Sequence, residues 1–259
     1  MKLPVPTPKL RELRKRLRWF ASAQDARFLQ GFFKTGPGEY GEGDQFIGVR
    51  VPAQRRLVRE FRGLALADTC DLLHSPIHEE RLLALLILVD AYNRGNESER
   101  AAIFRLYLDN TAYINNWDLV DGSAPGIVGR HLATRPRKIL FDLAGSPDVW
   151  KRRIAVLGAF HFIRRNEFAE ILRLAEMLLQ DRHHLIHKAV GWMLREAGKR
   201  DVTVLRGFLE RYAARMPRTM LRYAIEKLPV TERRCWLAVG REKAVEFKKH
   251  RRLPATAMQ

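Results

Sequence analysis

The chain has 259 residues, with 47 Lys and Arg against 29 Asp and Glu, which gives a formal net charge of +18 at pH 7. Its apolar fraction of 46% is enough for a hydrophobic core and excludes a disordered basic tail. A cationic excess of this size favours a polyanionic partner, with nucleic acid ahead of an anionic membrane surface.

The two cysteines, Cys70 and Cys235, are far apart and have no metal-ligand spacing, so we expect reduced thiols in an intracellular protein. Residues 1–8 lack the apolar core of a signal peptide. The longest apolar run, residues 82–89, is too short to span a bilayer. We therefore expect a soluble, cytoplasmic, nucleoid-associated protein without a membrane partner.

Helical periodicity recurs along nearly the whole chain, and no stretch shows the alternation of a strand. A basic amphipathic helix over 9–20 and a second helix over 23–33 precede a glycine-rich loop, 35–44. The loop has Gly-x-Gly pairs but follows no strand, so we interpret it as an irregular connection and not as a dinucleotide motif. Further helices are predicted over 52–61, 64–73, 77–92, 97–108, 117–132, 136–144, 149–162, 167–180, 183–197, 201–212, 217–227 and 231–239.

A weak internal repeat relates these helices. Four-residue strings that begin at 81, 118, 153, 188 and 222 align at spacings of 34 to 37 residues, with two helices in each interval. This period is typical of an α-solenoid of HEAT-like repeats. We therefore predict an all-α fold, a single repeat domain over 1–259, and disordered tails at 1–8 and 251–259.

The aligned strings begin with a cation in every repeat but one. Arg81, Arg153, Lys188 and Arg222 occupy this position, whereas the second string begins with Asp118. In a solenoid these cations would form a concave basic face that follows a nucleic-acid backbone. A solubilising role for the charges stays open, and so does a ribosomal partner.

Asp118, the exception among these cations, lies in Asn115–Asp121, a segment that we interpret as the start of a helix. Trp117 and Asp121 are four residues apart and share a helix face, where an indole and a carboxylate together suit a cation. Asp118 fits an ordinary role at a helix N-terminus, whereas Asp121 lies too deep in the helix for that role. Pro125 cannot donate to the Asp121 carbonyl, so we expect a kink there.

Four strings together resemble the AlkD-like family of DNA alkylation-repair glycosylases, which are built of HEAT-like repeats. They are Phe-Ile-Gly-Val-Arg-Val-Pro at 46–52, Asn-Trp-Asp-Leu-Val-Asp at 116–121, Val-Trp-Lys-Arg-Arg-Ile-Ala at 149–155, and Lys-Ala-Val-Gly-Trp-Met-Leu-Arg-Glu at 188–196. The resemblance covers roughly residues 20–230. By position it implies that Asp121 is the catalytic aspartate, that Trp117 and Trp192 are site tryptophans, and that Arg153 contacts DNA.

The resemblance also implies an activity. Such enzymes excise cationic N3- and N7-alkylpurines, such as 3-methyladenine and 7-methylguanine, from double-stranded DNA, need no metal or cofactor, and act without fully flipping the base. Three residues depart from the family's reference member. Asn116 replaces a tryptophan, and His184 with Leu185 replaces an aromatic pair. The preferred lesion is therefore left open.

The chemistry of these residues agrees with that activity. A cationic purine is a good leaving group that needs no protonation, so one carboxylate, Asp121, suffices to stabilise the oxocarbenium ion and to position water. Trp117 and Trp192 would contact the lesion nucleotide. Lys188 and Arg195, which share a helix face with Trp192, would join Arg153 in holding phosphates beside the lesion.

Two other interpretations stand beside this one. His183 and His187 are four residues apart, but no third ligand accompanies them, so a metal site is disfavoured. The second alternative is a non-catalytic HEAT-repeat module that binds damaged or branched nucleic acid. Intact Asp121, Trp117 and Trp192 favour the enzyme. The motif places no lysine as a Schiff-base nucleophile, so we expect a monofunctional glycosylase, and one DNA-binding face needs only a monomer.

Overall fold

The computed structural model describes residues 6–239, and this part of the chain is helical, as predicted. Residues 1–5 and 240–259, which include most of the predicted tails, lie outside the described range. The α-helices are α1 (Pro8–Trp19), α2 (Ala23–Phe32), α3 (Val51–Glu60), α4 (Leu66–Leu73), α5 (His78–Arg94), α6 (Glu97–Asp109), α7 (Trp117–Ala124), α8 (Lys138–Ala144), α9 (Val149–Gly158), α10 (Phe160–Ile163), α11 (Ala169–Met177), α12 (His184–Arg200), α13 (Val202–Tyr212) and α14 (Arg218–Ala224). A last helical stretch starts at 230 and reaches 239.

The chain forms two compact units, Met1–Pro136 and Arg137–Gln259, and the single repeat domain expected over 1–259 stays a prediction. The first helix starts inside the predicted N-terminal tail. The Thr7 side chain accepts a hydrogen bond from the Leu10 amide at 3.2 Å, and Pro8 occupies the first helical position, where its missing N–H costs nothing.

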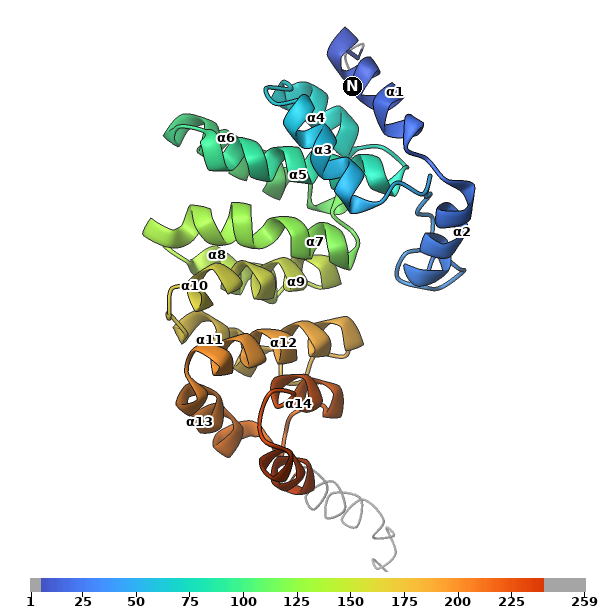
Figure 1. Ribbon diagram of the computed structural model, residues 1–259. Coiled ribbons are helices and arrows are strands. Elements are labelled where there is room, and N and C mark those ends of the chain that lie inside the picture. Colours follow the sequence, from blue (N-terminus) through green and yellow to red (C-terminus); the bar gives the residue numbers. More distant parts are fainter. Residues whose placement is uncertain (1–5, 240–259) are drawn as a thin grey trace, which may run out of the picture. The chain divides into compact units, whose positions relative to one another are not determined.

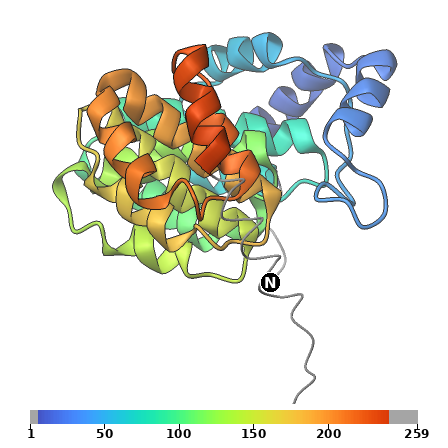
Figure 2. The same ribbon diagram turned by 90° about the horizontal axis from the view of Figure 1, so that it is seen from below.

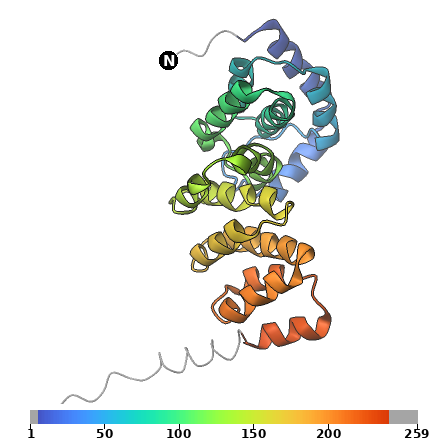
Figure 3. The ribbon, with the colours of Figure 1, turned by 90° about the vertical axis from the view of Figure 1, so that its left-hand side faces the viewer.

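In the first unit, α5 is the central helix and packs against α3, α4, α6 and α7 (Figure 3). Its apolar run, 82–89, supplies core residues such as Leu83 and Leu88, which are fully buried. The run that is too short for a membrane is thus the centre of a helical core. By contrast, α2 lies at the margin of this unit and buries none of its residues (Figure 2).

In the second unit, α12 has the central position and packs against α9, α11, α13 and α14 (Figure 1). Its contact with α14 is close because position 191 is glycine. A Cβ atom there would lie 2.4 Å from the Met220 carbonyl oxygen, so no larger residue fits without moving α14.

The helical repeat is confirmed within each unit. The five aligned strings all begin within the first five residues of a helix, namely α5, α7, α9, α12 and α14. In the first unit α5 packs against α7, and in the second α9 packs against α12 and α12 against α14. Helices that repeat in sequence therefore stack on one another, as a helical-repeat fold requires.

The predicted helix 117–132 is interrupted. The α-helix ends at Ala124, and a π-helical turn (Pro125–Gly129) and a 3₁₀ turn (Leu132–Thr134) follow. The interruption begins at Pro125 because this residue has no N–H for the carbonyl of Asp121. Ala124 and Pro125 keep right-handed helical angles, so the chain continues in a helical path.

Extended backbone is scarce in the described chain. Over residues 6–239 the structure has no strand, and an isolated parallel bridge joins Gln45 to Ile77. The loop 35–44 is a series of turns between helices, as predicted. In the same range, no helix is both long and apolar enough to cross a bilayer.

Candidate functional site

Trp117 and Asp121 lie one turn apart at the start of α7. Asn116 caps this helix, with its side-chain oxygen 2.8 Å from the Trp117 amide. Trp117 and Asp121 are both half-buried, so neither is an ordinary core residue. The N-terminal half of α7 therefore presents an indole and a carboxylate at a partly open surface.

The surroundings of Asp121 include a buried hydroxyl pair. The Tyr107 hydroxyl and the Ser123 hydroxyl are 2.9 Å apart, and the Ser123 hydroxyl donates to the Leu119 carbonyl at 2.5 Å. Burial, joined by the negative charge of Asp121, raises the pKa of Tyr107, although the bond to Ser123 opposes this. Tyr107 therefore stays a neutral phenol beside the helix that carries the carboxylate.

Aromatic rings from the end of α2 support Trp117. Phe33 stacks on the indole with ring centroids 5.0 Å apart and planes 18° apart. Phe32 meets it edge-on at 5.9 Å, and Phe32 is itself 53% exposed. Because Phe33 covers one face of the indole, the orientation of Trp117 depends on α2 as well as on α7.

A buried polar network joins α7 to the first turn of α5. The imidazole of His78 lies between two carboxylates, with Nδ1 2.9 Å from Asp44 and Nε2 2.8 Å from Asp118. Asp44 also accepts from Arg81 at 2.5 Å and from the Asn116 amide at 3.1 Å. We call these five residues the His78 network. It connects the loop, α5 and the beginning of α7.

The charge state of His78 follows from its neighbours. Burial alone would lower the pKa of His78, but the charge of Asp118 and the hydrogen bonds to Asp118 and Asp44 raise it to about 9. Burial likewise opposes ionisation of Asp44, yet His78 and Arg81 lower the pKa of this carboxyl below its usual range. His78 and Asp44 are therefore both ionised at neutral pH.

The same turn of α5 explains the string 46–52. Glu79 is 2% exposed, and its carboxylate accepts hydrogen bonds from the backbone amides of Ile47, Gly48 and Val49 at 2.7 to 3.2 Å. Gly48 has a φ of +81°, and a Cβ there would lie 2.1 Å from the Ser22 carbonyl oxygen. The string is therefore an anion-binding bend that positions α2 and α3.

In the second unit, the predicted residues of α12 share a face but differ in their contacts. The Trp192 indole N–H donates to Glu196 at 3.1 Å. Arg195 pairs with Glu226 and, at 3.5 Å, with Glu196. Lys188, by contrast, makes no ion pair with the described residues. Lys188 is therefore the predicted phosphate contact whose charge is least satisfied within the protein.

Arg153 and Arg81 are buried. Arg153 is 5% exposed and donates from Nη1 to the Leu185 carbonyl at 2.8 Å, which ties α9 to the first turn of α12. Arg81 is also 5% exposed, and its guanidinium belongs to the His78 network. Arg81 thus contributes no exposed cation, and the concave basic face is not confirmed.

The histidines at the start of α12 have local roles. His183 caps the helix, its Nδ1 accepting from the Leu185 amide at 3.2 Å, and the ring of His187 bonds the Asp181 carbonyl at 2.6 Å. Within residues 6–239, no three His, Cys, Asp or Glu side chains gather as metal ligands would. His183 and His187 thus help to hold the first turn of α12.

The structure places the predicted site residues in two sets. Trp117 and Asp121 lie together on α7 in the first unit. Arg153 of α9, with Lys188, Trp192 and Arg195 of α12, belongs to the second unit. A single site made from both sets stays a prediction.

Sequence reasoning missed the His78 network and the ring of Phe33. One signal was available: His78 opens a run of four charged or polar residues directly before the apolar core of α5. Such a run at the start of a buried helix predicts partners for each charge. Nothing in the sequence indicated that Asp44, in a loop of turns, would be one of them.

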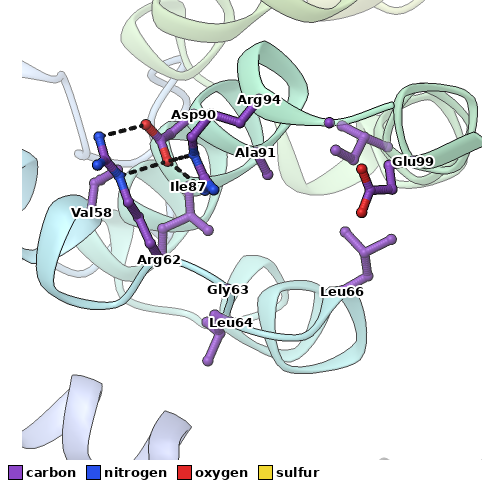
Figure 4. A pocket seen from close by; sticks show the side chains of 12 residues that line it. Val58, Arg62, Gly63, Leu64, Leu66, Ile87, Asp90, Ala91, Arg94 and Glu99 are labelled. Carbon is purple, nitrogen blue, oxygen red and sulfur yellow. Dashed lines mark hydrogen bonds and ion pairs between the residues drawn. The ribbon is translucent and has the colours of Figure 1, made fainter. Parts of the chain in front are cut away.

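A cavity of about 330 Å³ opens elsewhere in the first unit, beside the C-terminal half of α5 (Figure 4). Leu64 and Ile87 form part of its apolar wall. Arg62 and Arg94 at its rim both pair with Asp90, at 3.4 and 2.8 Å. None of the predicted site residues lines it, so this cavity lies apart from α7.

The fold and the residues of α7 define a helical-repeat protein with an indole and a carboxylate on one helix face. Comparison with known proteins identifies the family: residues 13–228 match the model described as DNA alkylation repair enzyme, and the chain belongs to this family. The resemblance inferred from the sequence is thereby confirmed.

A solved structure supports the fold. The chain is similar to a protein described as a predicted DNA alkylation repair enzyme from Enterococcus faecalis, with 16% identity and a TM-score of 0.65. The match covers 81% of this chain and 97% of that chain. No curated protein matches the sequence significantly.

Proposed function

We propose that the protein is a monofunctional DNA glycosylase that removes cationic N3- and N7-alkylated purines, such as 3-methyladenine and 7-methylguanine, from double-stranded DNA. The observation that carries this proposal is the pairing of half-buried Trp117 and Asp121 on one face of α7, in a member of the DNA alkylation repair enzyme family. The net charge of +18 supports DNA as the partner.

The proposed reaction is a hydrolysis at C1′ of the damaged nucleotide. The N-glycosidic bond breaks with its electron pair going to the base, which leaves as a neutral alkylpurine. Asp121 stabilises the positive charge that develops on the sugar and orients the water that attacks C1′. The proton of that water passes to solvent, and an abasic site remains.

The aromatic residues would bind the lesion. A cationic purine against the indole of Trp117 gains roughly 0.5–2 kcal/mol of cation–π attraction. Phe33 holds that indole from behind, so the ring needs little reordering on binding. Trp192 would act in the same way from the second unit.

The cations of the second unit would hold the DNA backbone. Lys188 is the residue we expect to contact a phosphate directly, because its charge is not already paired within the described chain. Arg195 would exchange its ion pairs with Glu226 and Glu196 for such a contact. Arg153 would act from its buried position beside the start of α12, and the protein would work as a monomer.

Release of free base from methylated duplex DNA tests the proposal. Wild-type protein should release 3-methyladenine or 7-methylguanine in the presence of EDTA and leave the strand unbroken. Asp121→Asn should slow single-turnover release by at least about 100-fold, because the amide removes the negative charge. Asp142→Asn is the matched control, since Asp142 is an exposed carboxylate of α8 paired with Lys138.

The control should release base at the wild-type rate. Equal rates for wild type and Asp121→Asn would exclude Asp121 as the catalytic group. Binding of damaged DNA without any base release by wild type would instead favour a non-catalytic HEAT-repeat module.

A further inference from the structure

The orientation of Trp117 and Asp121 depends on how the first turn of α7 is held. A charged contact ties this turn to α5, with Asp118 2.8 Å from His78. Asp118 lies between Trp117 and Asp121 in sequence, so its contact with His78 holds the backbone turn that carries both residues. The side chain of His78 is only 2% exposed, so His78 is not an ordinary surface residue.

The geometry favours an imidazolium at His78. A neutral imidazole has one N–H to donate, yet both ring nitrogens of His78 face carboxylate oxygens, at 2.9 Å from Asp44 and 2.8 Å from Asp118. Ionised carboxylates accept and do not donate, so this arrangement is fully satisfied when both nitrogens carry protons. The charges then balance, because His78 and Arg81 offset Asp44 and Asp118.

The ring of His78 also lies in the aromatic stack that supports Trp117. Its centroid is 4.5 Å from Phe46 and 4.9 Å from Phe33, and Phe33 in turn stacks on Trp117 at 5.0 Å. A cation among rings is attracted to their faces. His78 is thus connected to α7 twice, through Asp118 and through the ring of Phe33.

We propose that His78 is a positioning residue for the reaction, and that its imidazolium, held between Asp44 and Asp118, fixes the first turn of α7 so that Trp117 and Asp121 face the substrate. The proposal rests on the proposed function, because it assigns His78 a role through Asp121. His78 is buried, so in this proposal it acts only through Asp118 and Phe33.

The pH dependence follows from the groups around the ring. Asp44 faces it from the loop, Arg81 from its own helix, and Asp118 and Asn116 from α7. The pKa of His78 is about 9, above its ordinary value. The tie to α7 is therefore complete at neutral pH and is lost as the pH rises through about 9.

The test compares His78→Gln and the double variant His78→Gln/Asp118→Asn with wild type. Glutamine can donate to one carboxylate but carries no charge, so it breaks the bridge. The added Asp118→Asn removes the carboxylate that would otherwise be left buried without a partner. His131→Gln, at another buried histidine of the first unit, is the matched control.

A positioning role predicts that the two variants differ in thermal stability but share a reduced rate of base release. Thermal stability should fall in His78→Gln and largely return in the double variant. The single-turnover rate of base release should fall by about 10- to 100-fold in both, with little change in KM, because a small misplacement of Asp121 weakens transition-state stabilisation. In wild type the rate should also decline above about pH 9, a decline that both variants should lack.

Two measurements, an NMR titration and the rates of base release, distinguish a failure of this proposal from a failure of the proposed function. The His78 ring protons, followed by NMR, should titrate near pH 9 even if no base is released. Absence of base release by wild type would refute the glycosylase and, with it, the positioning role. Base release by wild type and by both variants at equal rates, or titration of His78 near its ordinary value, would overturn the role of His78 alone.

Discussion

Glu79 shows how a single residue of α5 organises its neighbours. A carboxylate buried to this degree is tolerated only where donors surround it, and the amides of 47–49 supply them. The first turn of α5 has four buried polar residues, each with its own contacts: His78, Glu79, Glu80 and Arg81. Glu80, for example, pairs with Arg14 at 2.9 Å and Arg18 at 3.1 Å, which fixes α1.

Replacing the buried carboxylate should therefore cost stability. Glu79→Gln places an amide NH₂ against backbone donors and leaves part of the amide array unsatisfied, so we expect a loss of about 2–3 kcal/mol in the free energy of unfolding. Denaturant unfolding measures it. Glu12→Gln, at an exposed position of α1, is the control and should differ from wild type by less than about 0.5 kcal/mol.

The His78 network should make stability depend on pH. The folded-state pKa of His78 is raised from 6.5 to about 9, so its contribution is complete below pH 6.5 and is lost as the pH rises through about 9. The shift corresponds to a contribution on the order of 3 kcal/mol. The thermal unfolding midpoints of wild type and His78→Gln should approach each other as the pH rises from 7 to 10. A constant difference across that range would contradict an ionised His78.

At the scale of elements, two glycines in helices of the second unit have opposite surroundings. Gly191 of α12 lies against α14, whereas Gly207 of α13 has no atom within 4 Å of its hypothetical Cβ. Replacement by alanine should thus change the free energy of unfolding in opposite directions at the two positions, because the space beside Gly191 is filled and the space beside Gly207 is open.

Gly191→Ala should destabilise the second unit by about 1–3 kcal/mol, since α14 must move away from α12. Gly207→Ala should stabilise it by about 0.5–1 kcal/mol through helix propensity. Hydrogen exchange of the α12 and α14 amides gives the local readout. Equal effects of the two variants would show that α14 moves at no cost.

At the scale of the whole molecule, a charge of +18 favours DNA as the partner, and the number of phosphates that its cations neutralise would set the salt dependence of binding. Lys188→Ala should reduce the magnitude of the slope of log K against log salt by about 0.9, the contribution of one phosphate contact. Arg195→Ala should lower it less, because Arg195 gives up ion pairs on binding. A salt titration of duplex binding measures both slopes, and an unchanged slope in Lys188→Ala would remove this residue from the backbone contacts.

The sequence by itself determined the helical-repeat fold, because apolar periodicity and a spacing near 35 residues are local properties of the chain. It also placed Trp117 and Asp121 on one helix face, since four residues make about one turn. From the missing N–H of Pro125 it predicted a kink within a helix over 117–132, whereas the structure ends the α-helix at Ala124 and continues with a π-helical turn.

Only the tertiary structure decided which charges are buried. Arg81 and Lys188 occupy equivalent positions in the repeat, yet Arg81 is buried in a network and Lys188 is not. The difference arises because Asp44, 37 residues away in a loop, folds against α5. Spacing along a helix fixes which residues share a face, but the partner of a charge is chosen by segments distant in sequence. The tie between His78 and the carboxylate beside Asp121 is of this second kind.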